Sequence, residues 1–167
     1  MYSIEIIKHK DIKLSNLIDI IDIKSKAWEY SYQEHMQWIE NNILPDDIHI
    51  LLLENNKYVA YLNLVDITLM IDNSNHKGYG VGNVCSIEKG KGYGKKLMKF
   101  ANNIIIEEKR VGLLFCKDSL VDFYSKTDWK LIEKEHLSLL FDNNMINAMF
   151  FNFEKEYNMV TYKDKSF

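Results

Sequence analysis

The sequence predicts an α/β fold in which helices flank a mixed β-sheet within a single domain. Strand-like and helix-like runs alternate between Val81 and Ile132, an order that is typical of layered α/β proteins. The chain has 167 residues, the usual size of one domain, and no internal repeat or proline-rich linker divides it. We therefore expect residues 1–167 to form one domain.

The N-terminal part predicts a strand followed by a helical region. Tyr2–Ile7 is a short β-type run. Apolar residues then recur at helical spacing from Leu14 to Ile43, which fits two helices or one helix broken near Glu29–Ser31. Pro45 should end this region, because proline cannot continue a helix.

Two strand-like runs, Ile48–Leu53 and Tyr58–Thr68, come next. The Asn-rich connection between them suits a tight hairpin turn. The residues from Ile71 to Lys77 are mostly polar and predict a loop.

The second half continues as alternating strands and helices and ends in a polar tail that we expect to be mobile. In chain order, the predicted elements are a strand at Val81–Ile87, a helix with its apolar face at Leu97–Ile105, a buried strand at Val111–Cys116, a short helix around Leu120–Tyr124, strands at Trp129–Ile132 and Ala148–Phe153, and the tail Tyr157–Phe167.

Composition excludes several classes of protein. With 21 basic and 24 acidic side chains the net charge is −3, which offers no general attraction for nucleic acid. No apolar run is long enough to span a membrane, and the first ten residues lack the features of a secretory signal. Two cysteines are too few for a disulfide framework, and the five histidines show no metal-ligand spacing. We expect a cytoplasmic protein, monomer or homodimer, without a metal, membrane or nucleic-acid partner.

Glycine marks one place in the chain. Six of the seven glycines fall between Gly78 and Gly94, and the run Lys89–Lys96 lies directly between a predicted strand and a predicted helix. Glycines there allow successive backbone N–H groups to converge on one point, and the start of the helix adds its positive dipole end. Four lysines in this run supply countercharge. The segment is therefore a predicted phosphate-binding loop.

Spacing separates the kinds of phosphate loop. A nucleotide P-loop would need glycine at Lys89 and Ser or Thr at Lys96, so that pattern fails twice. A dinucleotide fingerprint needs Gly-x-Gly-x-x-Gly, whereas this run has Gly-x-Gly-x-Gly and no acidic residue at the expected offset. A plain turn with solvated lysines remains the structural alternative.

Two motifs resemble the GNAT acetyltransferase superfamily. The run Lys89–Gly94 is similar to the family's Arg/Gln-x-x-Gly-x-Gly/Ala loop for the pyrophosphate of coenzyme A. Downstream, Leu120–Trp129 resembles the segment in which an aromatic-Tyr pair precedes, by five residues, an aromatic that opens the next strand. The resemblance is specific over residues 81–132. It departs from the family pattern at Lys89 (usually Arg or Gln), Asp128 (usually Gly) and Lys117 (commonly Asn).

The resemblance implies an acyl-CoA N-acyltransferase fold, acetyl-CoA as cofactor, and transfer of the acetyl group to a primary amine of a small molecule by direct attack in a ternary complex. It implies that Tyr124 protonates the leaving sulfur as general acid. The implied cofactor-binding residues are the strand backbone at Val84, Cys85 and Ser86 and the loop residues Lys89, Gly90, Lys91, Gly92, Tyr93, Gly94 and Lys95.

No general base is evident. Surface roles are the default for the five side chains that could serve: Asp46, Asp47, His49, Asp66 and Glu88. Cys85 and Cys116 lie in neighbouring predicted strands, and we interpret them as buried reduced thiols rather than nucleophiles.

The acceptor should be selected by the helical region and the loop at Ile71–Lys77. Aromatic and acidic residues gather in the helices (Trp28, Tyr30, Tyr32 and Trp38 with Glu29, Glu34 and Glu40), which suits a cationic small amine. The segment Cys116–Trp129 resembles that of aminoglycoside acetyltransferases. Core packing of an amphipathic helix pair is the simpler interpretation of the same residues. Three other functions stay open: a non-catalytic acyl-CoA-binding or regulatory module, a peptide or protein N-acetyltransferase, and a nucleotide-binding protein.

Overall fold

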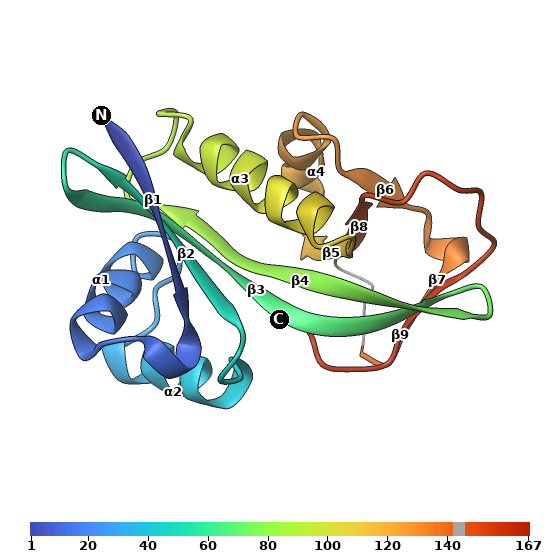
Figure 1. Cartoon of the computed structure of the whole chain (residues 1–167), viewed down its shortest axis with the longest axis horizontal. Coiled ribbons are helices and arrows are strands. Elements are labelled where there is room, and N and C mark those ends of the chain that lie inside the picture. Colours follow the sequence, from blue (N-terminus) through green and yellow to red (C-terminus); the bar gives the residue numbers. More distant parts are fainter. Residues whose placement is uncertain (142–145) are drawn as a thin grey trace. The chain divides into compact units, whose positions relative to one another are not determined.

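The computed structural model describes residues 1–141 and 146–167, and the chain forms two compact units. Unit 1 comprises Met1–Val65 and Gly82–Ala101, and unit 2 comprises Asp66–Val81 and Asn102–Phe167. Strands β3 (Lys57–Ile71) and β4 (Ser74–Ser86) and helix α3 (Tyr93–Glu107) contribute residues to both (Figure 1).

Unit 1 is built on the strand order β1-β2-β3-β4, with β1 (Tyr2–Lys8) and β2 (Ile48–Glu54) as its first strands. β1, β2 and β3 pair in antiparallel fashion. The hairpin between β2 and β3 turns through Asn55 and Asn56, whose φ angles are 50° and 62°. Asparagine tolerates this left-handed backbone better than most residues, so the predicted turn is confirmed with its physical cause.

After β1 and a short 3-10 turn (η1, His9–Asp11) come two helices, α1 (Leu14–Lys24) and α2 (Tyr32–Asn42). Of the two predicted alternatives, two separate helices is therefore correct. The break has a local cause, because Ser31 caps α2 by accepting from the backbone N–H of Glu34 while the Glu34 side chain accepts from the Ser31 N–H. Pro45 lies just beyond the end of α2.

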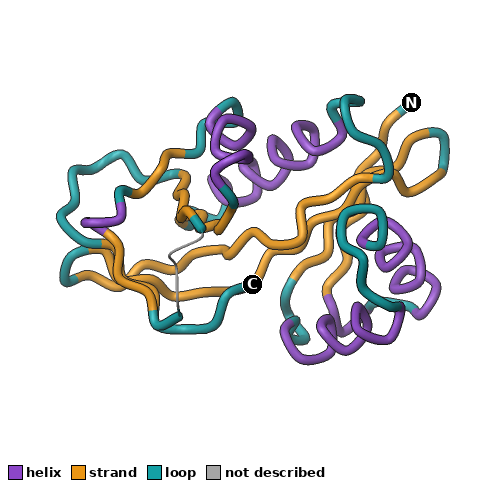
Figure 2. The backbone as a smooth tube through the Cα atoms, turned by 180° about the vertical axis from the view of Figure 1, so that it is seen from behind, coloured by secondary structure: helices purple, strands orange, loops and turns teal. Residues whose placement is uncertain are grey.

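A hydrophobic core lies between these helices and one face of the strands; α1 and α2 lie on this face, and the start of α3 lies on the other (Figures 1 and 2). The helices contribute a row of isoleucines, and the strands contribute Leu51, Tyr61 and Cys85. Trp28 and Trp38 pack against this core, as the simpler interpretation of the helix aromatics predicted.

Unit 2 continues β3 and β4 into a mixed sheet. β4 pairs in parallel with β5 (Val111–Cys116), β5 pairs antiparallel with β8 (Asn147–Phe151), and β8 pairs antiparallel with β6 (Lys130–Ile132). The remaining elements of this unit are α4 (Asp118–Ser125), η2 (Lys134–His136), β7 (Leu137–Leu139) and β9 (Val160–Tyr162).

Two predictions for this unit were wrong. The expected loop at Ile71–Lys77 is a tight hairpin: β3 ends at Ile71, Asp72 has φ of 52°, and β4 begins at Ser74. The tail Tyr157–Phe167 contains β9, which pairs with β3 and β7, and its Val160 and Tyr162 are 1% and 2% exposed. In both segments the outer face of the strand carries polar residues, so the sequence shows no continuous apolar run and resembles that of a loop.

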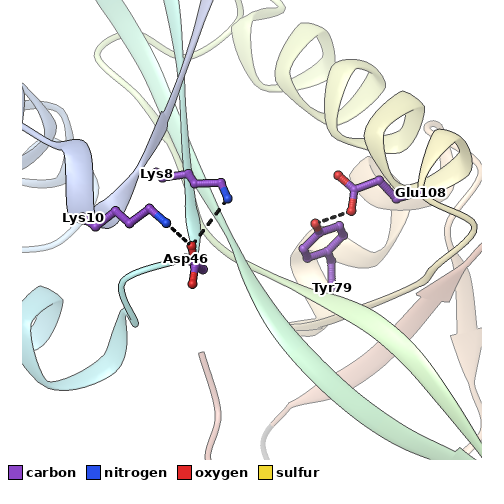
Figure 3. Close-up of polar contacts among 5 residues, drawn as sticks. All are labelled: Lys8, Lys10, Asp46, Tyr79 and Glu108. Carbon is purple, nitrogen blue, oxygen red and sulfur yellow. Dashed lines mark hydrogen bonds and ion pairs between the residues drawn. The ribbon is translucent and has the colours of Figure 1, made fainter.

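The single arginine joins several parts of unit 2. Arg110 pairs with Asp66 at 3.0 Å and with Glu108 at 3.3 Å, donates to the carbonyl of Gly78, and lies over the ring of Tyr79. The Tyr79 hydroxyl also bonds to Glu108 at 2.6 Å (Figure 3). Arg110 is thus a structural residue of this unit.

Candidate functional site

The predicted cofactor loop joins the end of β4 to the start of α3 within unit 1. Gly90 and Gly92 have φ angles of 83° and 75°, a backbone region that L residues other than glycine rarely adopt. Lys89, Gly90, Lys91 and Gly92 are exposed. A Cβ atom added at either glycine would meet nothing within 4 Å, so the backbone faces open space.

The first turn of α3 adds hydrogen-bond donors to this loop. The first helical hydrogen bond runs from the Lys96 N–H to the Gly92 carbonyl at 3.1 Å, so the preceding N–H groups have no partner within the helix. Tyr93, Gly94 and Lys95 occupy that turn. Their N–H groups and the helix dipole suit an anion, and the residues present therefore fit the pyrophosphate of coenzyme A.

Tyr93 anchors this loop with its side chain. It is 5% exposed, and its hydroxyl donates to Glu54 at the end of β2 at 2.6 Å. This hydrogen bond holds the pKa of Glu54 below its usual range and raises the pKa of Tyr93 to about 12. Because the Tyr93 hydroxyl is engaged with Glu54, Tyr93 can offer only its backbone N–H to the pyrophosphate.

The strand segment predicted to bind the pantetheine arm has an open side in unit 1. The pairs that join β4 to β5 cover Gly78–Gly80, in unit 2, so Gly82–Ser86 forms the last strand of the sheet within unit 1. On its other side this segment neighbours β3, and just beyond it the Ile87 N–H donates to the Val59 carbonyl. An edge strand presents backbone donors and acceptors to an extended ligand.

The side chains of Cys85 and Ser86 in this segment make contacts within unit 1. Cys85 is 7% exposed within the core under α1 and α2, and burial raises the pKa of its thiol to about 12. The Ser86 hydroxyl donates to the Glu88 carbonyl. Cys116, in unit 2, is likewise a buried free thiol with its pKa raised to about 11 by burial. Protonated thiols are poor nucleophiles, so neither cysteine suits covalent catalysis.

Tyr124, the predicted general acid, lies on α4 in unit 2. It is 6% exposed and its ring meets that of Phe123 edge-on. Its carbonyl accepts hydrogen bonds from the Thr127 N–H and hydroxyl and from the Trp129 N–H, at 2.9, 2.8 and 3.3 Å. Asp128, where the family usually has glycine, has a φ of 67° and so keeps the turn that glycine would make. The backbone of this motif is tightly fixed.

The side chains considered as general bases are engaged elsewhere. Asp46 pairs with Lys10 at 2.7 Å and with Lys8 at 3.5 Å (Figure 3), and Glu88 pairs with Lys91 at 3.6 Å. Asp47 accepts from the Leu44 N–H, and Asp66 holds Arg110.

His49 is the fifth side chain considered as a base, and it is fully buried. Its ring bonds to Tyr61 at 2.8 Å and to His9 at 2.9 Å. Burial, with His9 and Lys24 nearby, lowers the pKa of His49 to about 3, so the ring stays neutral inside unit 1.

Five polar side chains of unit 1 are buried without having been predicted so from sequence: Lys24, His35, Asp47, His49 and Asn63 are 2%, 2%, 2%, 0% and 0% exposed. The surface role expected for Asp47 and His49 was therefore wrong. Glu29, Glu34 and Glu40, by contrast, are exposed. Elsewhere, an open hollow in unit 2 lined by His136, Glu156, Tyr157 and Asn158 includes none of the predicted site residues. Within residues 1–141 and 146–167, no three metal-binding side chains gather, and no helix is both long and apolar enough to cross a membrane.

Comparison with known proteins decides the family. The sequence profile of the acetyltransferase (GNAT) domain matches residues 8–132. The chain belongs to the GNAT acetyltransferase family. Members of this family take the acetyl group from acetyl-CoA, and one structural neighbour was solved with coenzyme A.

Solved GNAT-type structures share the fold at low sequence identity. Escherichia coli ElaA has 16% identity and a TM-score of 0.62, with 90% of this chain and 99% of that chain covered. An acyl-CoA N-acyltransferase from Pseudomonas aeruginosa has 15% identity and a TM-score of 0.64 over 90% and 99%. The PaiA N-acetyltransferase of Thermoplasma acidophilum, solved in complex with coenzyme A, has 16% identity and a TM-score of 0.58 over 89% and 98%. No curated protein matches significantly in sequence.

Proposed function

We propose that this GNAT protein is an N-acetyltransferase that moves the acetyl group of acetyl-CoA to the primary amine of a small molecule. The observation that carries the proposal is the exposed loop with left-handed Gly90 and Gly92, placed between an edge strand and the start of α3. In this proposal residues 1–167 act as one acetyltransferase domain, located in the cytoplasm because its donor is an intracellular metabolite.

The roles of the residues follow from their chemistry. The N–H groups of the loop and of the first turn of α3 bind the pyrophosphate, and the side chains of Lys89, Lys91 and Lys95 offset its charge. The backbone of Val84, Cys85 and Ser86 binds the pantetheine amides as an added strand would and polarises the thioester carbonyl. Bound acetyl-CoA supplies an activated acyl group and a thiolate leaving group.

Tyr124 completes the proposed mechanism as general acid. The neutral amine would attack the carbonyl carbon directly, so that the C–N bond forms as the C–S bond breaks, and Tyr124 would give its phenol proton to the departing sulfur. The new amide nitrogen would lose one proton to water, and the Tyr124 phenolate would regain a proton from solvent. Direct attack needs no acyl-enzyme, which agrees with the high pKa of both cysteines.

A thiol-release assay tests the function. Purified protein is incubated with acetyl-CoA and a panel of amines that includes small amines, aminoglycosides and peptides. Release with small amines supports the proposal, and release with peptides alone would favour a peptide or protein acetyltransferase. Binding of acetyl-CoA without release on any amine would favour the non-catalytic module. If ATP or GTP raised the melting temperature where coenzyme A did not, the nucleotide-binding alternative would replace both.

Charge reversal at Lys91 tests the cofactor site. Lys91→Glu should weaken acetyl-CoA binding roughly tenfold, about 1.4 kcal/mol, because it replaces a cation beside the phosphates by an anion. Lys57→Glu is the matched control, since Lys57 is an exposed lysine of the β2-β3 hairpin, outside the loop. Calorimetry with acetyl-CoA should show the loss in the first variant only, and equal affinities would contradict the assigned loop.

A further inference from the structure

The carboxylate of Glu54 joins the first strands of unit 1 to the start of α3. Glu54 is the last residue of β2, and the β1-β2 register places Tyr2 directly opposite it. The Tyr93 hydroxyl donates to this carboxylate at 2.6 Å, and hydrogen bonds from Tyr93 and, more weakly, from Tyr2 lower the pKa of Glu54. The rings of Tyr2 and Tyr93 meet edge-on, with their centres 6.4 Å apart. The end of β2 and the starts of β1 and α3 thus lie at the same end of unit 1 (Figures 1 and 2).

Tyr93 is the residue through which this carboxylate acts on the cofactor loop. It is the first residue of α3, and its N–H is one of the donors assigned to the pyrophosphate. Its side chain is 5% exposed, so the packing of the ring sets the place of the helix start. The hydrogen bond to Glu54 fixes the far end of that ring. The position of the first turn of α3, with its free N–H groups, therefore depends on Glu54.

The loop that precedes Tyr93 is open and rich in glycine. Gly90 and Gly92 have left-handed backbones, and a Cβ atom at either would meet nothing within 4 Å. Lys91 between them is exposed and pairs at 3.6 Å with Glu88, which belongs to the same loop. Glycine loses more conformational freedom on being ordered than other residues do, and a ligand that must order its own site binds more weakly. A fixed point at the end of this loop therefore raises affinity, because it holds the donors in place before the ligand arrives.

We propose that Glu54 is a positioning residue of the cofactor site, which through Tyr93 holds the first turn of α3 and the loop before it in place for the pyrophosphate of acetyl-CoA. The inference rests on the proposed function and adds to it a residue that lies on another strand, outside both sequence motifs. The charge of Glu54 would itself repel the phosphates, so its contribution to binding is geometric. Tyr2, opposite Glu54 on β1, supports the carboxylate from the other side.

A second tyrosine–glutamate pair of unit 1 provides a matched control. Tyr58, near the start of β3, donates its hydroxyl to Glu5 on β1. Tyr58 packs against the core under α1 and α2, which lies on the other face of the strands from the start of α3. Loss of either hydroxyl removes the same kind of hydrogen bond, but only the hydroxyl of Tyr93 bears on the cofactor loop.

Calorimetry with acetyl-CoA measures the effect of this hydrogen bond. Tyr93→Phe keeps the ring and removes the bond, so affinity should fall about fivefold or more, whereas Tyr58→Phe should bind as wild type does. Glu54→Leu and Glu54→Gln both remove the charge, and only glutamine keeps an oxygen that can accept from Tyr93. Glu54→Leu should therefore bind about fivefold more weakly than Glu54→Gln. Adding Tyr93→Phe to Glu54→Leu should cause no further loss, because the shared interaction is already gone.

A donor without phosphates separates positioning from general stability. Acetyl-pantetheine carries the same thioester and the same pantetheine arm as acetyl-CoA but lacks the pyrophosphate. In the thiol-release assay Tyr93→Phe should raise the KM for acetyl-CoA with kcat unchanged, and it should leave the KM for acetyl-pantetheine as in wild type. A merely structural role of the hydrogen bond would affect both donors alike.

The possible outcomes separate the two proposals. The inference fails, while the acetyltransferase function stands, if Tyr93→Phe binds acetyl-CoA as tightly as wild type or if Tyr58→Phe loses as much affinity as Tyr93→Phe. Equal affinities of Glu54→Leu and Glu54→Gln, or an equal rise in KM for both donors, would overturn it as well. A wild-type protein that neither binds acetyl-CoA nor releases its thiol overturns both proposals.

Discussion

Replacement of Lys24 by methionine should stabilise the protein. Lys24 is 2% exposed, and no carboxylate acts on its pKa from the described part of the chain. Methionine keeps the length and flexibility of the apolar stem and removes the charge. The variant therefore isolates the cost of holding an unpaired ammonium inside unit 1.

The size of the effect follows from the pKa of Lys24, which is 10.5 for the free side chain and about 8 in the folded protein. At about 1.4 kcal/mol for each pH unit, the folded state is destabilised by about 3 kcal/mol at neutral pH. Methionine forfeits the contact of Nζ with Trp38, worth about 0.5–2 kcal/mol. The expected net gain is therefore about 1–3 kcal/mol.

The difference between wild type and variant should depend on pH with a definite sign. The pKa of Lys24 is lower in the folded than in the unfolded state, so between pH 8 and 10.5 the unfolded chain binds the additional proton. Wild-type stability then rises with pH relative to the variant across this window and is constant below it. In the folded state the neighbouring groups do not titrate there, because His35 and His49 are already neutral and the pKa of Cys85 is about 12. The Cys85 thiol of the unfolded chain, with a pKa of 9.0, titrates in wild type and variant alike and so cancels from their difference.

Urea unfolding followed by tryptophan fluorescence at pH 7 and pH 10 measures the effect. Lys24→Met should have the higher free energy of unfolding at pH 7, and most of its advantage should vanish at pH 10. Lys26→Met, at the exposed neighbouring lysine, should match wild type at both pH values. A Lys24→Met variant that is less stable than wild type at pH 7, or whose advantage is the same at both pH values, would refute the argument.

Two predictions concern the cofactor site and the proposed acid. Gly92→Ala should cost about 1–2 kcal/mol of stability, because Gly92 has a left-handed backbone with φ of 75°. It should also weaken acetyl-CoA binding at least tenfold, because the added Cβ occupies the open space over the loop. Thermal melting measures the first effect and calorimetry the second, and unchanged affinity would contradict the loop assignment. Tyr124→Phe should lower kcat by about 100-fold while acetyl-CoA affinity stays the same, because only a proton donor is lost. If the variant turned over as fast as wild type in the thiol-release assay, Tyr124 would have no part in the mechanism.

The glycine turn before α3 could be predicted from sequence because its signal is local, whereas its role as cofactor loop stays a prediction. Gly90 and Gly92 adopt the left-handed backbone that only glycine takes readily, and they stand next to the helix that they serve. The turn at Asn55-Asn56 was predicted from a local signal of the same kind. The cap at Ser31, which explains the break between the helices, was not predicted but is equally local. Each depends on residues within four positions of one another.

The hairpin at Asp72 and the strand β9 could not be predicted from sequence. Val160 pairs with Ile71, 89 positions earlier, and nothing near Val160 in the chain indicates this partner. Polar residues on the outer face of these strands concealed the alternation that a buried strand would show.

The sequence alone indicated the family and the alternation of strands and helices between residues 81 and 132, because short motifs and local periodicity depend on neighbouring residues. Only the tertiary structure showed that Lys24, His35 and Asn63 are buried, and that His35 and Asn63 each have one polar atom without a partner among the described residues. A lysine in the last turn of an amphipathic helix normally reaches solvent, and its local sequence is the same when it does not. Burial and the absence of a counter-ion are properties of the space around a side chain, and that space is filled by residues far away in the chain.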